Sequence, residues 1–217
     1  MKDLSLWKQL TEQFKMRWED LLSSTFTHIE LVLISMVLAI VVAVPLGILI
    51  TRVRSLATPV ISGAGILQTI PSLAMLGFMI PLFGIGTKTA VAALFLYSLL
   101  PIIRNTYTGI KDVDPAVTEA ARGLGMTSWQ ILFKVELPLS ASVIMAGVRT
   151  AAVINVGTAT LAAFIGGGGL GEFIFLGITR NIDALILLGA IPAALLAIIL
   201  EFSLAKLERV TTPKGLK

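Results

Sequence analysis

Long apolar runs alternate with short polar and charged segments along the 217-residue chain. The uncharged runs cover residues 31–50, 55–87, 150–171 and 184–200. About 18 to 20 such residues, as a helix, cross the roughly 30 Å hydrocarbon layer of a bilayer. The pattern therefore predicts an all-α fold, a polytopic membrane bundle of about five helices at residues 29–51, 57–82, 87–104, 139–165 and 183–205. The third of these is the least hydrophobic.

Composition supports a membrane protein. Hydrophobic residues make up 56% of the chain and charged residues only 14%, against about 25% in soluble domains. There is no cysteine, and His28 is the single histidine, which excludes disulfides and Cys/His metal sites. We expect His28 at the interfacial surface. The basic residues are scattered and not interleaved with aromatic residues, which argues against nucleic-acid binding.

Residues 1–28 are mixed and charged and predict an extracytoplasmic or interfacial segment. No small-residue cleavage site follows the first apolar run, so we do not expect a removed signal peptide. Trp7, Leu10, Phe14 and Trp18 recur at helical spacing. This spacing indicates an amphipathic helix on the membrane surface, and a solvated leader is the alternative.

The distribution of Lys and Arg predicts the orientation, because cytoplasmic loops carry the excess. With the N-terminus outside, ten basic residues lie inside: Arg52, Arg54, Arg104, Lys111, Arg122, Lys134, Lys206, Arg209, Lys214 and Lys217. Six lie outside: Lys2, Lys8, Lys15, Arg17, Lys88 and Arg180. We therefore predict a transmembrane domain over 29–208, a cytoplasmic loop over 104–138 and a cytoplasmic tail over 209–217.

The loop 104–138 reads as two short helices. Asp114 is a helix N-cap with Pro115 at the first helical position, and Gly123 and Gly125 supply a stop. Thr127 and Gln130 then form the pattern of a capping box at the start of a second helix. Nothing in the chain resembles a phosphate-binding G-x-x-x-x-G-K-[ST] loop. If this chain served a transporter that draws on ATP, the ATP site would therefore have to lie on another chain.

Seven residues in this loop carry a specific pattern: Glu119, Ala120, Ala121, Gly125, Val135, Leu137 and Pro138. Their spacing resembles the E-A-A-x-x-x-G-x(9)-I-x-L-P signature of binding-protein-dependent importer permeases, with Val135 in place of isoleucine. The resemblance implies a permease of the type I ATP-binding-cassette (ABC) importer kind, in which these residues couple the permease to a partner ATPase.

The same resemblance implies the partners. These are cytoplasmic ATPase subunits, a second identical or related permease subunit, an extracytoplasmic substrate-binding protein and membrane lipid, in the bacterial cell membrane. It implies no cofactor on this chain, with ATP and Mg²⁺ on the ATPase, and therefore a transporter subunit and not an enzyme.

Three further segments are similar to the osmoprotectant branch of these permeases: residues 70–74, 100–110 and 164–171. That branch carries glycine betaine, carnitine and choline. An importer of an amino acid or an ergothioneine-like solute remains the alternative within the class. An ion-coupled carrier or channel would be expected to show inverted repeats or paired intramembrane charges, and a membrane enzyme would need a catalytic constellation; neither is evident.

Polar residues at membrane depth usually face the bundle or a cavity. Candidates for the translocation path are Gln68, Thr69, Ser72, Asn155 and Thr158, with helix-to-helix hydrogen bonding as the alternative for each. Arg149 either marks the cavity wall or means that the fourth span starts later. The run 166–171 is too rich in glycine to continue a helix, and predicts a re-entrant turn at an outer gate.

Overall fold

The computed structural model describes residues 5–211, and every regular element within that range is a helix. The elements in chain order are α1 (Leu6–Arg52), α2 (Arg54–Thr69), α3 (Ser72–Phe83), α4 (Thr87–Lys111), α5 (Pro115–Gly123), α6 (Ser128–Ile131), a π-helical turn (Leu132–Glu136), α7 (Leu137–Ala159), a 3₁₀ helix (Thr160–Ile165), α8 (Gly171–Arg180) and α9 (Asp183–Thr211). The all-α prediction is confirmed. The predicted tail, 209–217, lies mostly outside the described residues.

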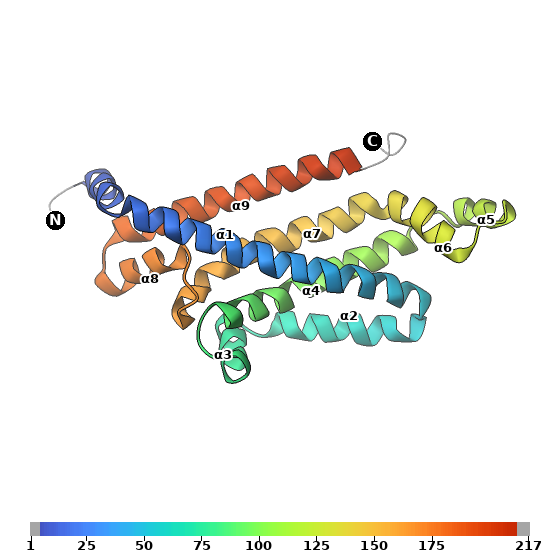
Figure 1. Cartoon of the computed structure of the whole chain (residues 1–217), viewed down its shortest axis with the longest axis horizontal. Helices are drawn as coiled ribbons and strands as arrows, with labels where there is room; N and C mark the ends of the chain where they lie inside the picture. Colours follow the sequence, from blue (N-terminus) through green and yellow to red (C-terminus); the bar gives the residue numbers. More distant parts are fainter. Residues whose placement is uncertain (1–4, 212–217) are drawn as a thin grey trace.

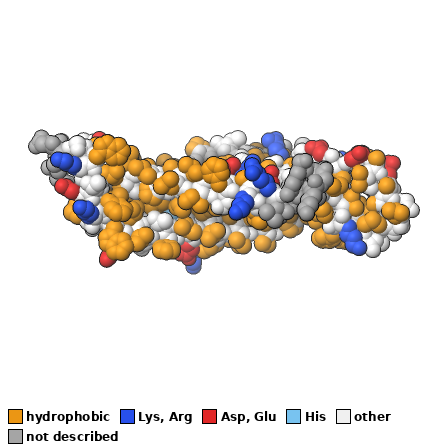
Figure 2. All heavy atoms as spheres, turned by 90° about the horizontal axis from the view of Figure 1, so that it is seen from above, with side chains coloured by type: hydrophobic (Ala, Val, Ile, Leu, Met, Phe, Trp, Pro, Cys, Tyr) orange, Lys and Arg blue, Asp and Glu red, His pale blue; other side chains and the backbone are white. Residues whose placement is uncertain are grey.

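The described residues form an elongated bundle with membrane-spanning dimensions (Figure 1). Four helical stretches are long and apolar enough to cross a bilayer: Leu6–Arg52, Thr87–Lys111, Ser128–Ile165 and Asp183–Arg209. A fifth pass results if α2 and α3 are counted together. In Figure 2 a largely uncharged belt of hydrophobic side chains separates charged groups at the N-terminal end from those toward α5 and α6.

The second predicted span, 57–82, is not one straight helix. It breaks into α2 and α3, whose axes are bent by 104°. Ile70 is extended, with φ −69° and ψ 127°, because the ring of Pro71 disfavours the helical conformation of the residue before it. The expectation of a continuous second span was therefore wrong, and backbone groups are released from helical pairing at the break.

α1 is longer than the first predicted span, because the helix continues without a break through residue 28. The interruption lies earlier, at Arg17, whose φ of −128° and ψ of 19° are not helical. The first turns of α1 consequently lie at an angle to the rest of the helix (Figure 1). Three of the four residues of the predicted amphipathic stripe are exposed: Trp7, Phe14 and Trp18.

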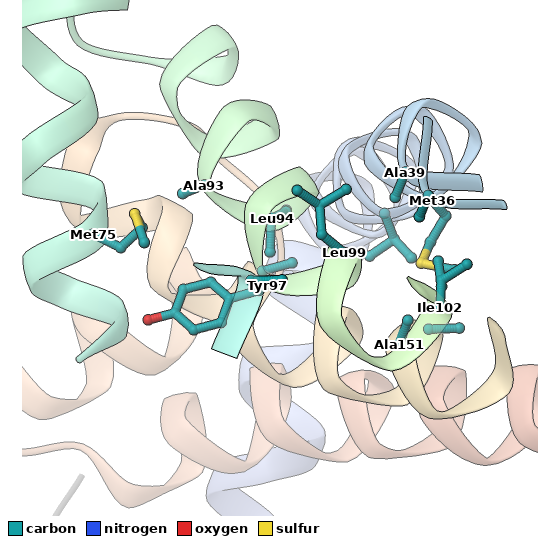
Figure 3. Packing of buried hydrophobic residues seen from close by; sticks show 14 of the residues in the cluster. Met36, Ala39, Met75, Ala93, Leu94, Tyr97, Leu99, Ile102 and Ala151 are labelled. Carbon is teal, nitrogen blue, oxygen red and sulfur yellow. The ribbon is translucent and has the colours of Figure 1, made fainter. Parts of the chain in front are cut away.

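The core lies where α4 packs between α1 and α7. Small residues let these helices approach closely, and the fully or almost fully buried ones include Ala39, Ala90, Ala93 and Ala151 (Figure 3). Among the four long stretches, α4 has the lowest hydropathy. It also has the largest share of buried residues, 56% of its most apolar 18-residue segment. A central helix faces protein more than lipid, so it needs less apolar side-chain surface than a peripheral helix.

The end of the bundle opposite α5 and α6 contains a helix that the sequence analysis missed (Figure 1). The 3₁₀ helix ends at Gly166, and the chain turns through residues with positive φ at Gly166, Gly168 and Gly169 before α8 begins at Gly171. α8 packs against α9 and the 3₁₀ helix. The glycine run thus interrupts the helix as expected, and its role as an outer gate stays a prediction.

Candidate functional site

The coupling segment (residues 112–136) projects from one end of the bundle between α4 and α7 (Figure 1). Its first helix, α5, is capped as predicted. Asp114 Oδ1 accepts a 2.8 Å hydrogen bond from the backbone N–H of Ala116, and Pro115 occupies the first turn, where no N–H is required. Arg122 in the last turn complements the helix dipole. A nine-residue helix, too short to be stable alone, is thereby held at both ends.

The turn after α5 depends on Gly125. Its φ of +81° lies in the left-handed region that favours glycine. The N–H of Gly125 donates to the carbonyl of Arg122 at 2.9 Å, and that of Met126 to the carbonyl of Ala121 at 3.2 Å, which closes the helix end. A Cβ at Gly125 would meet nothing within 4 Å. Within the described residues, the glycine is therefore needed for its conformation and not for space.

The seven residues of the coupling pattern divide into a tip and a base. At the tip, Glu119 and Ala120 are exposed on α5, whereas Ala121 is buried against the segment itself. The half-buried residues at the base, where the segment enters α7, are Val135, Leu137 and Pro138. The tip presents a carboxylate beside a small side chain, and the base joins it to a long helix. Such a segment can pass movement of a docked protein into the bundle.

α6 begins with the predicted capping box. The Thr127 N–H donates to Gln130 Oε1 at 2.8 Å, and the Gln130 N–H donates to Thr127 Oγ1 at 3.3 Å. Trp129 and Phe133 then stack with ring centroids 5.9 Å apart, and both are exposed. They border an apolar groove of about 660 Å³ whose opposite wall is the last two turns of α1. The coupling segment thus faces the end of α1 across this groove.

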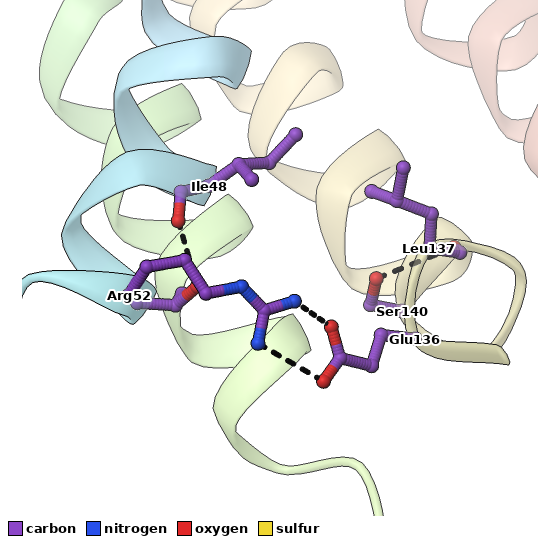
Figure 4. Close-up of polar contacts among 6 residues, drawn as sticks. Ile48, Arg52, Glu136, Leu137 and Ser140 are labelled. Carbon is purple, nitrogen blue, oxygen red and sulfur yellow. Dashed lines mark hydrogen bonds and ion pairs between the residues drawn. The ribbon is translucent and has the colours of Figure 1, made fainter. Parts of the chain in front are cut away.

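A two-point ion pair joins the base of the coupling segment to the end of α1. The guanidinium of Arg52, the last residue of α1, donates through Nη1 to Glu136 Oε1 at 3.2 Å and through Nη2 to Glu136 Oε2 (Figure 4). Glu136 is buried at the end of the π-helical turn, so the pair satisfies a carboxylate that water reaches poorly. The sequence analysis used Arg52 only as a topology marker and missed this pair. Neither residue carries a local signal of its partner, because 84 positions separate them.

Three of the five predicted path residues meet at the break between α2 and α3. Gln68 Nε2 donates to the carbonyl of Tyr97 at 3.0 Å, and Thr69 Oγ1 donates to the carbonyl of Ile66 at 2.7 Å. Thr69 is exposed, and Ser72 is half-buried at the start of α3. This group places three polar side chains at the point where the backbone leaves the helical conformation.

The other two predicted path residues lie on α7. Asn155 is fully buried, and its Nδ2 donates to Ser35 Oγ on α1 at 3.1 Å. Thr158 is half-buried and donates to the carbonyl of Ile154 within its own helix at 2.9 Å. Asn155 thus makes the helix-to-helix hydrogen bond that was the alternative interpretation, and the path assignment of both residues stays a prediction.

Comparison with known proteins identifies the class. The model of the binding-protein-dependent transport system inner membrane component family matches residues 39–212. The chain belongs to this family. A solved structure of the MetNI methionine ABC transporter has the same fold, with a TM-score of 0.81 at 22% identity over 92% of this chain and 99% of that one. The chain is therefore a multi-pass membrane permease of the type I ABC importer fold.

Two curated relatives are similar over almost their full length. The glycine betaine/carnitine/choline transport system permease protein OpuCB of Bacillus subtilis is 51% identical over 91% of both chains. The carnitine transport permease protein OpuCB of Listeria monocytogenes is 50% identical over 94% of both chains.

The permease pairs its one basic residue in the middle of α7 with two carboxylates. Arg149 Nε lies 3.3 Å from Glu201 Oε1, and Arg149 Nη1 lies 3.1 Å from Glu208 Oε2. Both glutamates are on α9. A charge at membrane depth is costly unless it is paired, and here a neighbouring helix neutralises it. α7 begins at Leu137, so the helix of the fourth span does not start later than predicted.

The permease also buries its single histidine, contrary to the expectation that His28 lies at the interfacial surface. His28 has no exposed surface, and its Nε2 lies 3.1 Å from the carbonyl of Val156 on α7. At the end of α7 the backbone N–H of Thr160 donates to the carbonyls of Gly157 and Thr158, and not to the carbonyl of Val156 four positions earlier. The carbonyl of Val156 is therefore released from the helical ladder, and the imidazole N–H supplies its donor.

Proposed function

We propose that this permease imports quaternary ammonium osmoprotectants, namely glycine betaine, carnitine or choline. The observation that carries the proposal is the 51% and 50% identity to permeases named for these solutes, over more than nine tenths of each chain. Identity of this order over the whole membrane region favours a shared solute class over the methionine of the more distant structural neighbour, which is 22% identical.

The solute passes the α2–α3 break. Backbone that leaves helical pairing at membrane depth is tolerated only against protein or a water-filled cavity. Here the break carries the polar side chains of Gln68, Thr69 and Ser72, and Thr69 is exposed on the surface of the single chain. We assign this surface to the path between the chain and a second permease subunit.

The energy comes from a partner. An ATPase that binds ATP and Mg²⁺ docks on the tip of the coupling segment, around Glu119 and Gly125, and the permease itself needs no cofactor. The segment then lies in the cytoplasm and α8 lies outside, together with the N-terminus. This orientation agrees with the excess of Lys and Arg expected on the inner side. A separate extracytoplasmic binding protein delivers the solute at the α8 end.

Uptake by the reconstituted importer tests the proposal. The permease is placed in proteoliposomes with its ATPase, its binding protein and any sister permease, and uptake of radiolabelled glycine betaine, carnitine, choline and methionine is measured with and without enclosed ATP. ATP-dependent accumulation of at least one quaternary ammonium solute, and not of methionine, is expected. Accumulation of methionine alone would overturn the solute class. Equal uptake with an ATPase variant that binds but does not hydrolyse ATP would overturn the energy source.

A further inference from the structure

Pro101 leaves a carbonyl without its helical donor in the middle of α4. In an α-helix the N–H of each residue bonds to the carbonyl four positions earlier, and proline has no N–H. The carbonyl affected by Pro101 is that of Tyr97, which lies within the buried core. Its donor comes from another helix, since Gln68 Nε2 at the end of α2 bonds to it at 3.0 Å.

The side chain of Tyr97 makes the reciprocal bond. Its phenolic O–H donates to the carbonyl of Ile70, the extended residue between α2 and α3. That carbonyl also lacks a helical donor, because the first backbone bond of α3 runs from Met75 to Pro71. Figure 3 shows the Tyr97 ring in the core with its hydroxyl directed away from the labelled α4 residues, on the side of Met75.

The two hydrogen bonds join two defects. Gln68, at the α2–α3 break, donates to the α4 carbonyl that Pro101 leaves without a helical donor, and Tyr97, on α4, donates to the carbonyl of Ile70 in the break. Tyr97 is only 7% exposed, so its carbonyl is largely shielded from water, and Ile70 is half-buried. Packing alone would be served by phenylalanine at position 97, but phenylalanine would leave the carbonyl of Ile70 without a donor.

We propose that Gln68 and Tyr97 are positioning residues for solute passage: their reciprocal hydrogen bonds hold the α2–α3 break at the bend that presents Thr69 and Ser72 to the path. The inference rests on the proposed function of that surface. Gln68, assigned above to the path itself, then acts on the path through α4. The bond pair connects the path to the central helix, which packs against both α1 and α7.

The test uses substitutions that keep shape and remove one donor. Tyr97→Phe removes the hydroxyl, and Gln68→Met removes the amide N–H. Tyr107→Phe, on the same helix, is the control, because within the described residues its hydroxyl makes no hydrogen bond. Tyr97→Phe and Gln68→Met are called the brace variants. Each should lower the maximal rate of ATP-dependent uptake about tenfold, as expected when a buried carbonyl loses its donor. The apparent KM for the loaded binding protein should change less than about twofold, because that protein docks at the outer face. Uptake by both brace variants at the rate of the control would overturn the inference.

A rescue separates the hydrogen bond from general packing. Pro101→Ala restores an N–H that can bond to the carbonyl of Tyr97 within α4. In that background Gln68→Met should cause no further loss, whereas Tyr97→Phe should remain harmful, because the carbonyl of Ile70 still lacks its donor. Equal harm from Gln68→Met in both backgrounds would contradict the proposed role of its amide.

A thiol-labelling measurement covers variants that do not transport. The sequence has no cysteine, so a Thr69→Cys substitution gives the only labelled site on this chain when a membrane-impermeant quaternary ammonium thiol reagent is added to the reconstituted importer and the labelled permease is then separated from its partners. Labelling should occur and should change in rate when Tyr97→Phe is added, but not when Tyr107→Phe is added. An unchanged rate with Tyr97→Phe would overturn the inference alone. Complete absence of labelling would overturn the path assignment on which it rests.

Discussion

Arg52 and Glu136 pair side chain to side chain across 84 positions of sequence, the first ending α1 and the second ending the π-helical turn before α7. The pair (Figure 4) ties the base of the coupling segment to α1, a helix that runs along the bundle (Figure 1). We therefore expect movement at the tip of the segment to be transmitted to α1 as well as to α7.

Removing the arginine of this pair should weaken coupling. Arg52→Ala leaves the carboxylate of Glu136 buried without its counter-charge, a change that costs 3–5 kcal/mol for fully buried pairs. Because the Arg52 side chain is 42% exposed, we expect a smaller loss, about 1–2 kcal/mol. Thermal unfolding in detergent and ATP-driven uptake should both decline. Arg54→Ala, at an exposed position two residues later, is the control, and an equal decline in that variant would contradict the role of the pair.

Replacing Gly125 should uncouple the permease without preventing its insertion. Gly125→Val forces a β-branched residue to a φ of +81°, and left-handed backbone costs about 1–2 kcal/mol for residues with a Cβ. The turn between α5 and α6 should be lost, together with ATP-driven uptake and co-purification of the ATPase. Gly123→Ala is the matched control, since a Cβ there meets nothing within 4 Å and no positive φ is present. Normal uptake by Gly125→Val at normal membrane levels would refute the proposed turn.

Two glycines of α7 should differ in how well they tolerate alanine. A Cβ at Gly147 would lie 2.6 Å from Asn105 Cβ and 2.7 Å from the carbonyl oxygen of Pro101, whereas a Cβ at Gly157 would meet nothing within 4 Å. Gly147→Ala should force α7 away from α4 and lower stability by about 1–3 kcal/mol, the usual cost of overpacking. Gly157→Ala should be neutral within about 0.5 kcal/mol. The melting temperatures of the two purified variants test this order, and equal values would contradict the close α4–α7 contact.

The Arg149 cluster predicts an asymmetry between its members. Arg149→Gln leaves the carboxylates of Glu201 and Glu208 without the cation between them, and should lower stability by about 2 kcal/mol. Glu201→Gln leaves Arg149 paired with Glu208 at 3.1 Å, and should cost less than about 1 kcal/mol. Thermal unfolding of the two variants measures the difference. A larger loss from Glu201→Gln would mean that the cluster does not neutralise Arg149 as described.

Local features of the fold could be predicted from the sequence because their causes are local. The cap at Asp114, the capping box at Thr127 and the turn at Gly125 each depend on residues within a few positions of one another, and the structure confirms all three. The long apolar runs are local in the same sense, and they correctly indicated a membrane bundle.

Contacts between distant residues could not be predicted in this way. His28 was expected at the surface, yet it bonds to Val156 at a separation of 128 positions. Pro71 and Pro101 each leave backbone groups without helical partners, but the sequence does not say which side chains satisfy the carbonyls concerned. α8 was missed because its short apolar run follows a glycine-rich turn and is too brief to register as a span.

The sequence by itself determined the class, the helical content and the coupling pattern, because periodicity, capping and motif spacing are properties of neighbouring residues. Only the tertiary structure decided how the polar groups are paired. Arg52 pairs with Glu136, and Arg149 with Glu201 and Glu208. Gln68 donates to the carbonyl of Tyr97, and Tyr97 donates to the carbonyl of Ile70. The physical reason is that a low-dielectric interior requires each released polar group to find a partner, and helix packing brings that partner from a distant part of the chain.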